Sequence, residues 1–288
     1  MATSMVTGGT SGIGREFVTQ LASRGDDIVI VARDTTRMAQ IKEQIEARYG
    51  VSVETIQADL SNRHDVASVA ERLEDPDSPI DLLVNDAGFA VHAKILDPDS
   101  LELQNRAFEV MCRAVLELSA AAGRAMVSRG HGAILNVSSS SAWINTGNYS
   151  ALKAWVLTFT EGLSNELHGT GVHAMALCPG WVHTEFHSRA GVTANHLPDF
   201  FWIPTDVLVR EALLREKYRG GQAYYVAPRL KDLPDIERFL REQVPEVKFV
   251  VGHGQMSATQ LEGVMSAFYD GEYDVLVSTT IVESGLDI

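Results

Sequence analysis

A glycine-rich segment near the start of the chain limits the possible folds more than any other feature. Residues 7–14 read TGGTSGIG and lie between an apolar strand and a helix in the predicted order. In such a segment, Gly8 permits a tight turn, Gly12 lets the backbone approach a phosphate, and Gly14 permits close helix–strand packing. N–H groups at the start of the helix then point at the phosphate. The predicted dinucleotide-binding residues of this turn are Gly8, Thr10, Ser11, Gly12, Ile13 and Gly14. The alternative is an ordinary strand-to-helix turn.

A second motif, far downstream, combines a phenol with an ammonium group. Tyr149 and Lys153 are four residues apart, so on a helix they lie on one face. A nearby positive charge favours the phenolate, and we expect Lys153 to lower the pKa of Tyr149 from its usual value of about 10. A phenol tuned in this way can exchange a proton near neutral pH while a cofactor moves a hydride. The alternative is a surface pair without a chemical role.

The glycine spacing G-x3-G-x-G, followed far downstream by Tyr149 and Lys153, resembles the short-chain dehydrogenase/reductase family. The resemblance implies an α/β fold of the Rossmann type, with a doubly wound parallel sheet. It also implies an oxidoreductase that transfers a hydride between nicotinamide and a carbonyl or alcohol substrate. Apolar runs that are typical of parallel strands occur at 27–32, 80–84, 132–137 and 171–178.

The resemblance also assigns the catalytic residues. A serine just beyond the predicted strand 132–137 would hydrogen-bond the substrate carbonyl or its alkoxide, and the family register selects Ser139 from the run Ser138–Ser141. Tyr149 would donate the proton, and Lys153 would hold the nicotinamide ribose. The interval from Ser139 to Tyr149 is shorter than is usual in the family, which implies a trimmed loop.

The residue after the predicted strand 27–32 bears on the choice of cofactor. In a dinucleotide fold, an acidic residue near this strand end would bind the ribose 2′-hydroxyl, whereas an arginine suits a 2′-phosphate. Arg33 occupies the position, and Arg15 adds positive charge nearby. The sequence therefore predicts NADP rather than NAD. The alternative is that Arg33 ends a strand in solvent.

Further cofactor contacts follow from the resemblance alone. Asp59-Leu60 resembles the adenine-contacting pair of the family, and residues 85–88 (NDAG) resemble its Asn-Asn-Ala-Gly motif. Residues 179–184 (PGWVHT) resemble the segment beside nicotinamide. These motifs add the following predicted cofactor-binding residues: Asp59, Leu60, Asn85, Ala87, Gly88, Pro179, Gly180, Val182 and Thr184, with Tyr149 and Lys153 shared by both sites.

The chain departs from the family pattern at one position. The family usually carries an asparagine in the long helix before the predicted strand 132–137, where it supports a water chain from the lysine to solvent. Met111 occupies that position here. Asn105 lies six residues upstream and about 240° away around the helix, so it cannot replace the missing amide.

Composition favours an enzyme over several other classes. A net charge of −14 argues against a broad nucleic-acid surface. Cys112 and Cys178, the two cysteines of the chain, fall in a predicted helix and a predicted strand, which favours packed thiols in a reducing compartment. No Cys/His cluster has metal-ligand spacing, and no apolar run is long enough to span a membrane. With no signal peptide apparent, we expect a cytoplasmic enzyme; the family resemblance is compatible with a homo-oligomer.

The character of the sequence changes after residue 204. Residues 185–204 read as a lid, and their aromatic side chains (Phe186, Phe200, Phe201 and Trp202) suggest either an apolar substrate or packing on the sheet. From about residue 207 to 288, three segments resemble the second motor lobe of the bacterial transcription-repair coupling factor: 219–226 (RGGQAYYV), 252–256 (GHGQM) and 278–288 (STTIVESGLDI). No G-x4-G-K-[ST] phosphate loop is present, so ATP hydrolysis lacks its usual phosphate-binding loop.

The two resemblances predict how the chain is divided. A helix over 205–219 and a strand over 222–227 would complete the dehydrogenase sheet, giving a dinucleotide-binding domain at 1–227. Residues 228–288 would form a partial helicase-lobe-like α/β segment, with helices at 234–243 and 258–269 and strands at 247–251 and 273–278. Two functional alternatives remain: a fragment of a DNA translocase, and a chimera with little activity.

Overall fold

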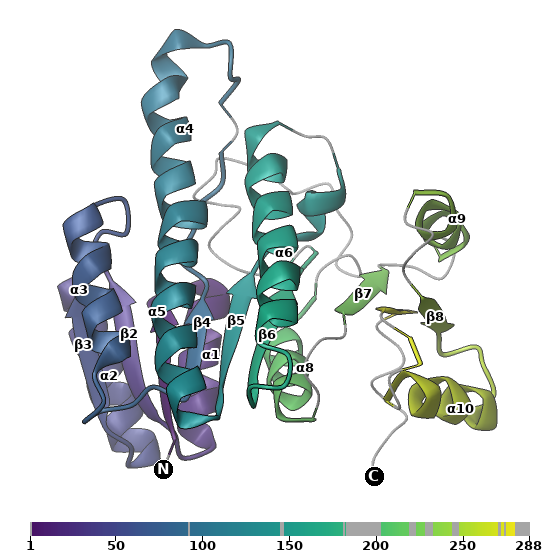
Figure 1. Ribbon diagram of the computed structural model, residues 1–288, viewed down its shortest axis with the longest axis horizontal. Coiled ribbons are helices and arrows are strands. Elements are labelled where there is room, and N and C mark those ends of the chain that lie inside the picture. Colours follow the sequence, from purple (N-terminus) through teal and green to yellow (C-terminus); the bar gives the residue numbers. More distant parts are fainter. Residues whose placement is uncertain are drawn as a thin grey trace.

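The computed structural model describes residues 2–91, 93–144, 147–180, 182, 203–218, 223–227, 233–243, 248–269, 272–273 and 275–279. A six-stranded parallel sheet occupies its larger part (Figure 1). The strand order is β3-β2-β1-β4-β5-β6. The strands are β1 (Thr3–Thr7), β2 (Asp27–Ala32), β3 (Val53–Gln57), β4 (Leu82–Asn85), β5 (Gly132–Val137) and β6 (Val172–Leu177).

The strand order places a ligand site at one edge of this sheet. The chain runs outward from β1 to β3 and then returns to place β4 on the other side of β1, so the order reverses there. In the register, Thr7 pairs with both Val31 and Asn85, which brings the carboxyl ends of three strands together. Open α/β sheets bind ligands at such a switch point. The predicted doubly wound α/β fold is confirmed.

Helices cover both faces of the sheet, which explains why its strands are apolar along their whole length. Ile28 and Ile30 of β2 lie in one core and Val29 and Val31 in the other. The helices on the Ile30 face are α1 (Gly12–Ser23), α2 (Thr35–Tyr49) and α8 (Thr205–Tyr218). Those on the Val29 face are α3 (Arg63–Glu74), α4 (Leu101–Phe108), α5 (Ala114–Arg129) and α6 (Asn148–Glu166).

Three short helical segments complete this part of the chain. A π-helical turn, η2 (Glu109–Arg113), joins α4 and α5 into one long helix (Figure 1). Two 3-10 turns, η1 (Pro98–Ser100) and η3 (Ser140–Trp143), precede α4 and α6. Within the described ranges, no helix is long and apolar enough to cross a membrane.

The helix expected over 205–219 is confirmed as α8, and it packs on the dehydrogenase-like part. Val209, Ala212 and Leu213 are nearly inaccessible and lie in the same core as Phe17 of α1. The Gln20 side chain also donates to the backbone carbonyl of Asp206, at 2.7 Å. The chain that resembles a translocase therefore supplies a helix to the six-stranded core.

The expected pairing of strand 222–227 with the main sheet is wrong. This strand, β7 (Ala223–Ala227), pairs in parallel with β9 (Val275–Thr279), which also pairs with β8 (Phe249–Gly252). The result is a separate three-stranded sheet in the order β7-β9-β8. Two helices, α9 (Leu233–Gln243) and α10 (Ala258–Tyr269), accompany it, as the sequence predicts.

The small sheet has a core on each face. Val277 of β9 packs with Leu240 of α9, and the neighbouring Leu276 packs with Phe268 of α10. Successive residues of a strand point to opposite faces, so α9 and α10 cover the two sides of one sheet. Because β7 joins β8 and β9, the sheet has three strands and can form a layered unit with a helix on each face.

Candidate active site

The glycine-rich turn connects β1 to α1 and leaves no room for larger residues. Gly8 and Gly12 have φ angles of +74° and +55°, a region that glycine occupies without strain. A Cβ on Gly14 would lie 2.6 Å from the carbonyl oxygen of Gly8 and 2.7 Å from a carboxylate oxygen of Asp86. Ser11, the N-cap of α1, makes no side-chain capping bond. The start of α1 therefore keeps backbone N–H groups for an anion.

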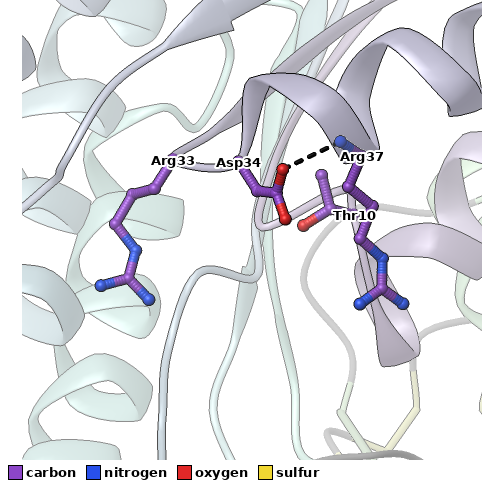
Figure 2. A pocket seen from close by; sticks show the side chains of 4 residues that line it. All are labelled: Thr10, Arg33, Asp34 and Arg37. Atoms are coloured by element: carbon purple, nitrogen blue, oxygen red, sulfur yellow. Dashed lines mark hydrogen bonds between the residues drawn. The ribbon is translucent and has the colours of Figure 1, made fainter.

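A pocket of about 340 Å³ lies beside this turn, at the end of β2 (Figure 2). It is lined by Thr10, Arg33, Asp34 and Arg37. Asp34 is the N-cap of α2, and one of its carboxylate oxygens accepts from the Arg37 backbone N–H at 2.9 Å. The two guanidinium groups flank Asp34 (Figure 2). Arrangements of this kind suit a phosphate group.

Arg15 is placed differently from the expectation. Its guanidinium donates to Thr19 and Gln44, at 3.2 and 3.3 Å, and it does not line the pocket. The second cation of the pocket is Arg37, which the sequence reasoning missed. The available signal was its spacing: Arg33 and Arg37 are four residues apart at the start of α2.

The three predicted catalytic residues lie together next to the carboxyl end of β5. Ser139 is the N-cap of η3 and Tyr149 lies in the first turn of α6, and the Ser139 side chain is close enough to lower the pKa of the Tyr149 phenol. Lys153 is 6% exposed, and its Nζ donates to the carbonyl oxygen of Val137 at 2.7 Å. The same Nζ lies 5.9 Å from the centre of the Tyr149 ring. The turn from β5 into η3 thus brings the serine to the tyrosine–lysine face of α6.

The predicted lowering of the Tyr149 pKa by Lys153 is wrong. Burial raises the pKa of Tyr149 to about 12, the hydrogen bond with Ser139 opposes the rise, and the charge of Asp86 adds to it. Burial lowers the pKa of Lys153, and the charge of Asp86 opposes this change. Helical spacing alone did not reveal that Asp86 and burial dominate this environment.

Other side chains of the serine run have separate partners. Ser138 is buried, and its hydroxyl donates to the carbonyl oxygen of Lys153 at 2.6 Å. Cys178 lies against Ser138, and burial raises the pKa of its thiol to about 12. Burial likewise raises the pKa of Cys112 to about 11. Both cysteines are free thiols; Cys112 is buried and Cys178 is half-buried.

The segment after β4 is held by the neighbouring strands. The Thr7 hydroxyl accepts from the backbone N–H groups of Asp86 and Ala87, at 3.1 and 3.2 Å. Asn85 is buried, and its amide donates to Ser119 and Asn136. Gly88, the last residue of this motif, is exposed. These bonds direct the backbone of the motif toward the glycine-rich turn.

The remaining predicted cofactor residues that fall within the described ranges lie along the same edge of the sheet. Asp59 accepts from Ser61 and forms an ion pair with Arg106 at 3.2 Å, and Leu60 is buried. Pro179 and Val182 are buried and Gly180 is exposed. Thr184 and the four aromatic residues of the expected lid lie outside the described residues. Among the residues that are described, no group of His, Cys, Asp and Glu could hold a metal ion.

Comparison with known proteins agrees with this geometry. Residues 2–194 match the family of short chain dehydrogenases. The chain belongs to the short-chain dehydrogenase family. A short-chain dehydrogenase from Sphingobium yanoikuyae in complex with NADPH has a similar structure, with a TM-score of 0.74 and 31% identity; the match covers 90% of this chain and 99% of that one. A short chain dehydrogenase of Pseudocercospora fijiensis (strain CIRAD86) is 36% identical over 188 residues, which are 64% of this chain and 60% of that protein.

The remainder of this short-chain dehydrogenase matches a different family. Residues 205–288 match the helicase conserved C-terminal domain. The transcription-repair-coupling factor of Rickettsia prowazekii (strain Madrid E) is 54% identical over 82 residues, which are 28% of this chain. The chain spans only 7% of the length of that factor. Both resemblances stated from the sequence are thus confirmed, and α8 lies on the helicase-like side of the boundary while it packs on the dehydrogenase core.

Two positions distinguish this chain within the family pattern. Met111 lies in the π-helical turn and is buried, and its sulfur would be 3.2 Å from a Cβ on Gly88. A thioether is at most a weak acceptor, so Met111 cannot supply the hydrogen bonds of an amide. Asp86, in the place of the second asparagine of the family motif, faces both the glycine-rich turn and Lys153. The sequence reasoning named the motif but missed the importance of this substitution.

Proposed function

We propose that this protein is an NADP-dependent oxidoreductase that transfers a hydride between nicotinamide and an apolar carbonyl or alcohol substrate. The observation that carries the proposal is the position of the Lys153 ammonium, 5.9 Å from the centre of the Tyr149 ring, with Ser139 close enough to act on the Tyr149 phenol. This group stands at the sheet edge that also carries the glycine-rich turn. The proposed proton donor, Tyr149, and the glycine-rich turn proposed to bind the cofactor therefore lie at the same edge of the sheet. The apolar substrate is suggested by the aromatic residues between 185 and 204.

The side chains have separate roles in the proposed reaction. The cofactor supplies the hydride. Ser139 holds the substrate oxygen, and Tyr149 donates a proton to it during reduction. A phenol with a pKa of about 12 is protonated at neutral pH and can therefore act as the acid. Lys153 supplies a positive charge beside the phenol and holds the nicotinamide ribose.

The preference for NADP rests on the pocket beside the turn. Arg33 and Arg37 offer two cations for a 2′-phosphate, and Thr10 adds a hydroxyl. Asp34, the acidic residue nearest the strand end, uses one oxygen to cap α2. The similar structure of the dehydrogenase from Sphingobium yanoikuyae is in complex with NADPH. The two free thiols are in keeping with a reducing, cytoplasmic compartment.

Turnover of a carbonyl panel with NADPH tests the proposal. We expect the wild type to oxidise NADPH in the presence of at least one apolar ketone or aldehyde. Tyr149→Phe should lower kcat by about 100-fold or more, because general acid catalysis contributes on that order, while NADPH affinity changes little. Circular dichroism of both proteins serves as the folding control. Turnover that persists in Tyr149→Phe would reject this role of Tyr149.

A second candidate function is a fragment of a DNA translocase, and the 54% identity over 82 residues favours it. The sequence has no phosphate loop of the form G-x4-G-K-[ST], and its net charge is −14. Both features weaken this candidate. Incubation with ATP and DNA distinguishes the two functions: we expect no ATP hydrolysis. ATP hydrolysis stimulated by DNA would favour the translocase reading.

We also propose a division of the chain that differs from the expected boundary at 227. The dehydrogenase unit extends through α8, since that helix lies in its core. The helicase-like unit begins with β7, which pairs only with β9 among the described strands. The boundary then falls between Tyr218 and Ala223.

A further inference from the structure

Asp86 occupies a position between the glycine-rich turn and the lysine of the active site. A Cβ on Gly14 would lie 2.7 Å from its Oδ2, so the carboxylate lies directly against the first turn of α1. The Lys153 ammonium acts on it from α6. The Asp86 carboxyl group thus lies at the end of α1 that is proposed to bind an anion. It also interacts with the charge of Lys153, which is proposed to hold the ribose.

Among the described residues, the groups that act on a negative charge on Asp86 come from α1 and α6. The Gly14 N–H faces it from α1, and Lys153 and Tyr149 face it from α6. Burial raises the pKa of Asp86 to about 7, although Lys153 and the Gly14 N–H both favour the carboxylate. Asp86 is half-buried, and its raised pKa brings the change of charge closer to neutral pH than in a free aspartate.

This charge bears directly on the binding of a dinucleotide. A helix N-terminus attracts phosphate through its free N–H groups and its dipole. An ionised Asp86, which lies against Gly14, places a negative charge at the same end of α1. It also offsets the positive charge of Lys153. Both effects weaken the attraction for an anionic ligand, and protonation of Asp86 removes both.

We propose that Asp86 is a positioning residue that makes dinucleotide binding dependent on pH, with its neutral form favouring the bound state. The inference rests on the proposed function, because it requires the glycine-rich turn to bind the cofactor. An asparagine at this position, as in the family motif, keeps the shape and the acceptor oxygen but cannot ionise. Asp86→Asn is therefore a matched control within the same site.

The test measures NADPH affinity by fluorescence titration of both proteins from pH 6.5 to 8.5. We expect the wild-type Kd to rise about tenfold over this range, since one group with a pKa near 7 loses its proton. The Kd of Asp86→Asn should change by about twofold or less, and at pH 8.5 this variant should bind more tightly than the wild type. The 2′-phosphate of NADPH is common to both titrations, so its own ionisation does not distinguish them.

Calorimetry of the wild type gives a second measurement that needs no variant. Titrations with NADPH at pH 7.5, in buffers of different ionisation enthalpy, should show net proton uptake on binding. Equal pH dependence in the wild type and a folded Asp86→Asn would overturn the inference, as would proton release by the wild type. Binding of NADPH without pH dependence rejects only this inference. A lack of NADPH binding at every pH rejects the proposed function along with it.

Discussion

At the scale of single residues, the site combines features that local sequence reveals with others that only the fold reveals. The glycines of the turn and the pair Tyr149 and Lys153 follow from motifs of fixed spacing, because each motif lies on one turn or one helix, whereas Ser139 was chosen by the register of the family. Arg37 and Asp86 matter because the strands bring them beside other segments. For Asp86 the important neighbours, Gly14 and Lys153, are distant in the sequence, whereas the spacing of Arg37 from Arg33 was a local signal that the sequence reasoning did not use.

The arginine pair gives a prediction about cofactor choice. Arg33→Ala and Arg37→Ala should each weaken NADPH binding about tenfold to 100-fold, since a hydrogen bond to a charged group contributes about 1.5–3 kcal/mol. The Kd for NADH should change little, because NADH has no 2′-phosphate. Titration of both cofactors with each variant checks this. Arg15→Ala is the control, since its guanidinium binds Thr19 and Gln44. Equal losses for NADH and NADPH would contradict the assignment.

The cysteines give a prediction about reactivity. The thiolate is the reactive form, and burial raises the pKa of Cys112 to about 11 and of Cys178 to about 12. Both thiols should therefore resist iodoacetamide at pH 8 in the native protein and react when urea unfolds it. Mass spectrometry of the alkylated chain measures this. Rapid labelling of native Cys178 would show that its environment is more open than described.

At the scale of elements, α8 joins the two parts of the chain. Its sequence matches a helicase domain, yet Val209, Ala212 and Leu213 lie in the dehydrogenase core with Phe17. The core of the six-stranded sheet can be completed by any helix whose apolar face has a suitable size and pattern, whichever family that helix comes from. The helical spacing of 205–219 predicted this element, and the family resemblance predicted that it completes the dehydrogenase part.

Substitutions on α8 test its place in the core. Leu213 is 1% exposed and Arg210 is exposed. Leu213→Ala should lower the free energy of unfolding by about 2–5 kcal/mol, the usual cost of truncating a buried leucine. Arg210→Ala should change it by about 0.5 kcal/mol or less. Urea denaturation followed by circular dichroism measures both. A Leu213→Ala protein as stable as the wild type would remove α8 from the core.

At the scale of the whole molecule, two units from different families share one chain. The small sheet was the part that the sequence predicted least well. Alternating and apolar patterns identified β7, β8 and β9 as strands, but a strand pattern does not name its partner. β7 follows α8 directly, and sequence order favoured the main sheet. β7 instead pairs with β9, some fifty residues later in the sequence, and local patterns do not reveal so distant a partner.

Truncation tests this division. A protein comprising residues 1–218 should remain folded and bind NADPH within about twofold of the full chain, because α8 and the six-stranded sheet are complete. A protein comprising residues 1–204 lacks α8 and should lose stability or fail to fold, since the apolar surface of α1 becomes exposed. Thermal denaturation and NADPH titration compare them with the full chain. Loss of binding in the 1–218 protein would show that the small sheet supports the cofactor site.

The central position of β9 in the small sheet has a consequence for synthesis on the ribosome. β7 and β8 both pair with β9 and not with each other, and β9 is the last of the three to be made. Until it emerges, two strands carry unpaired edges, while the dehydrogenase unit has already left the exit tunnel and can fold. Translation that stops before Val275 would leave those edges without a partner. Such a product would be prone to aggregation even though it carries a complete dinucleotide-binding fold.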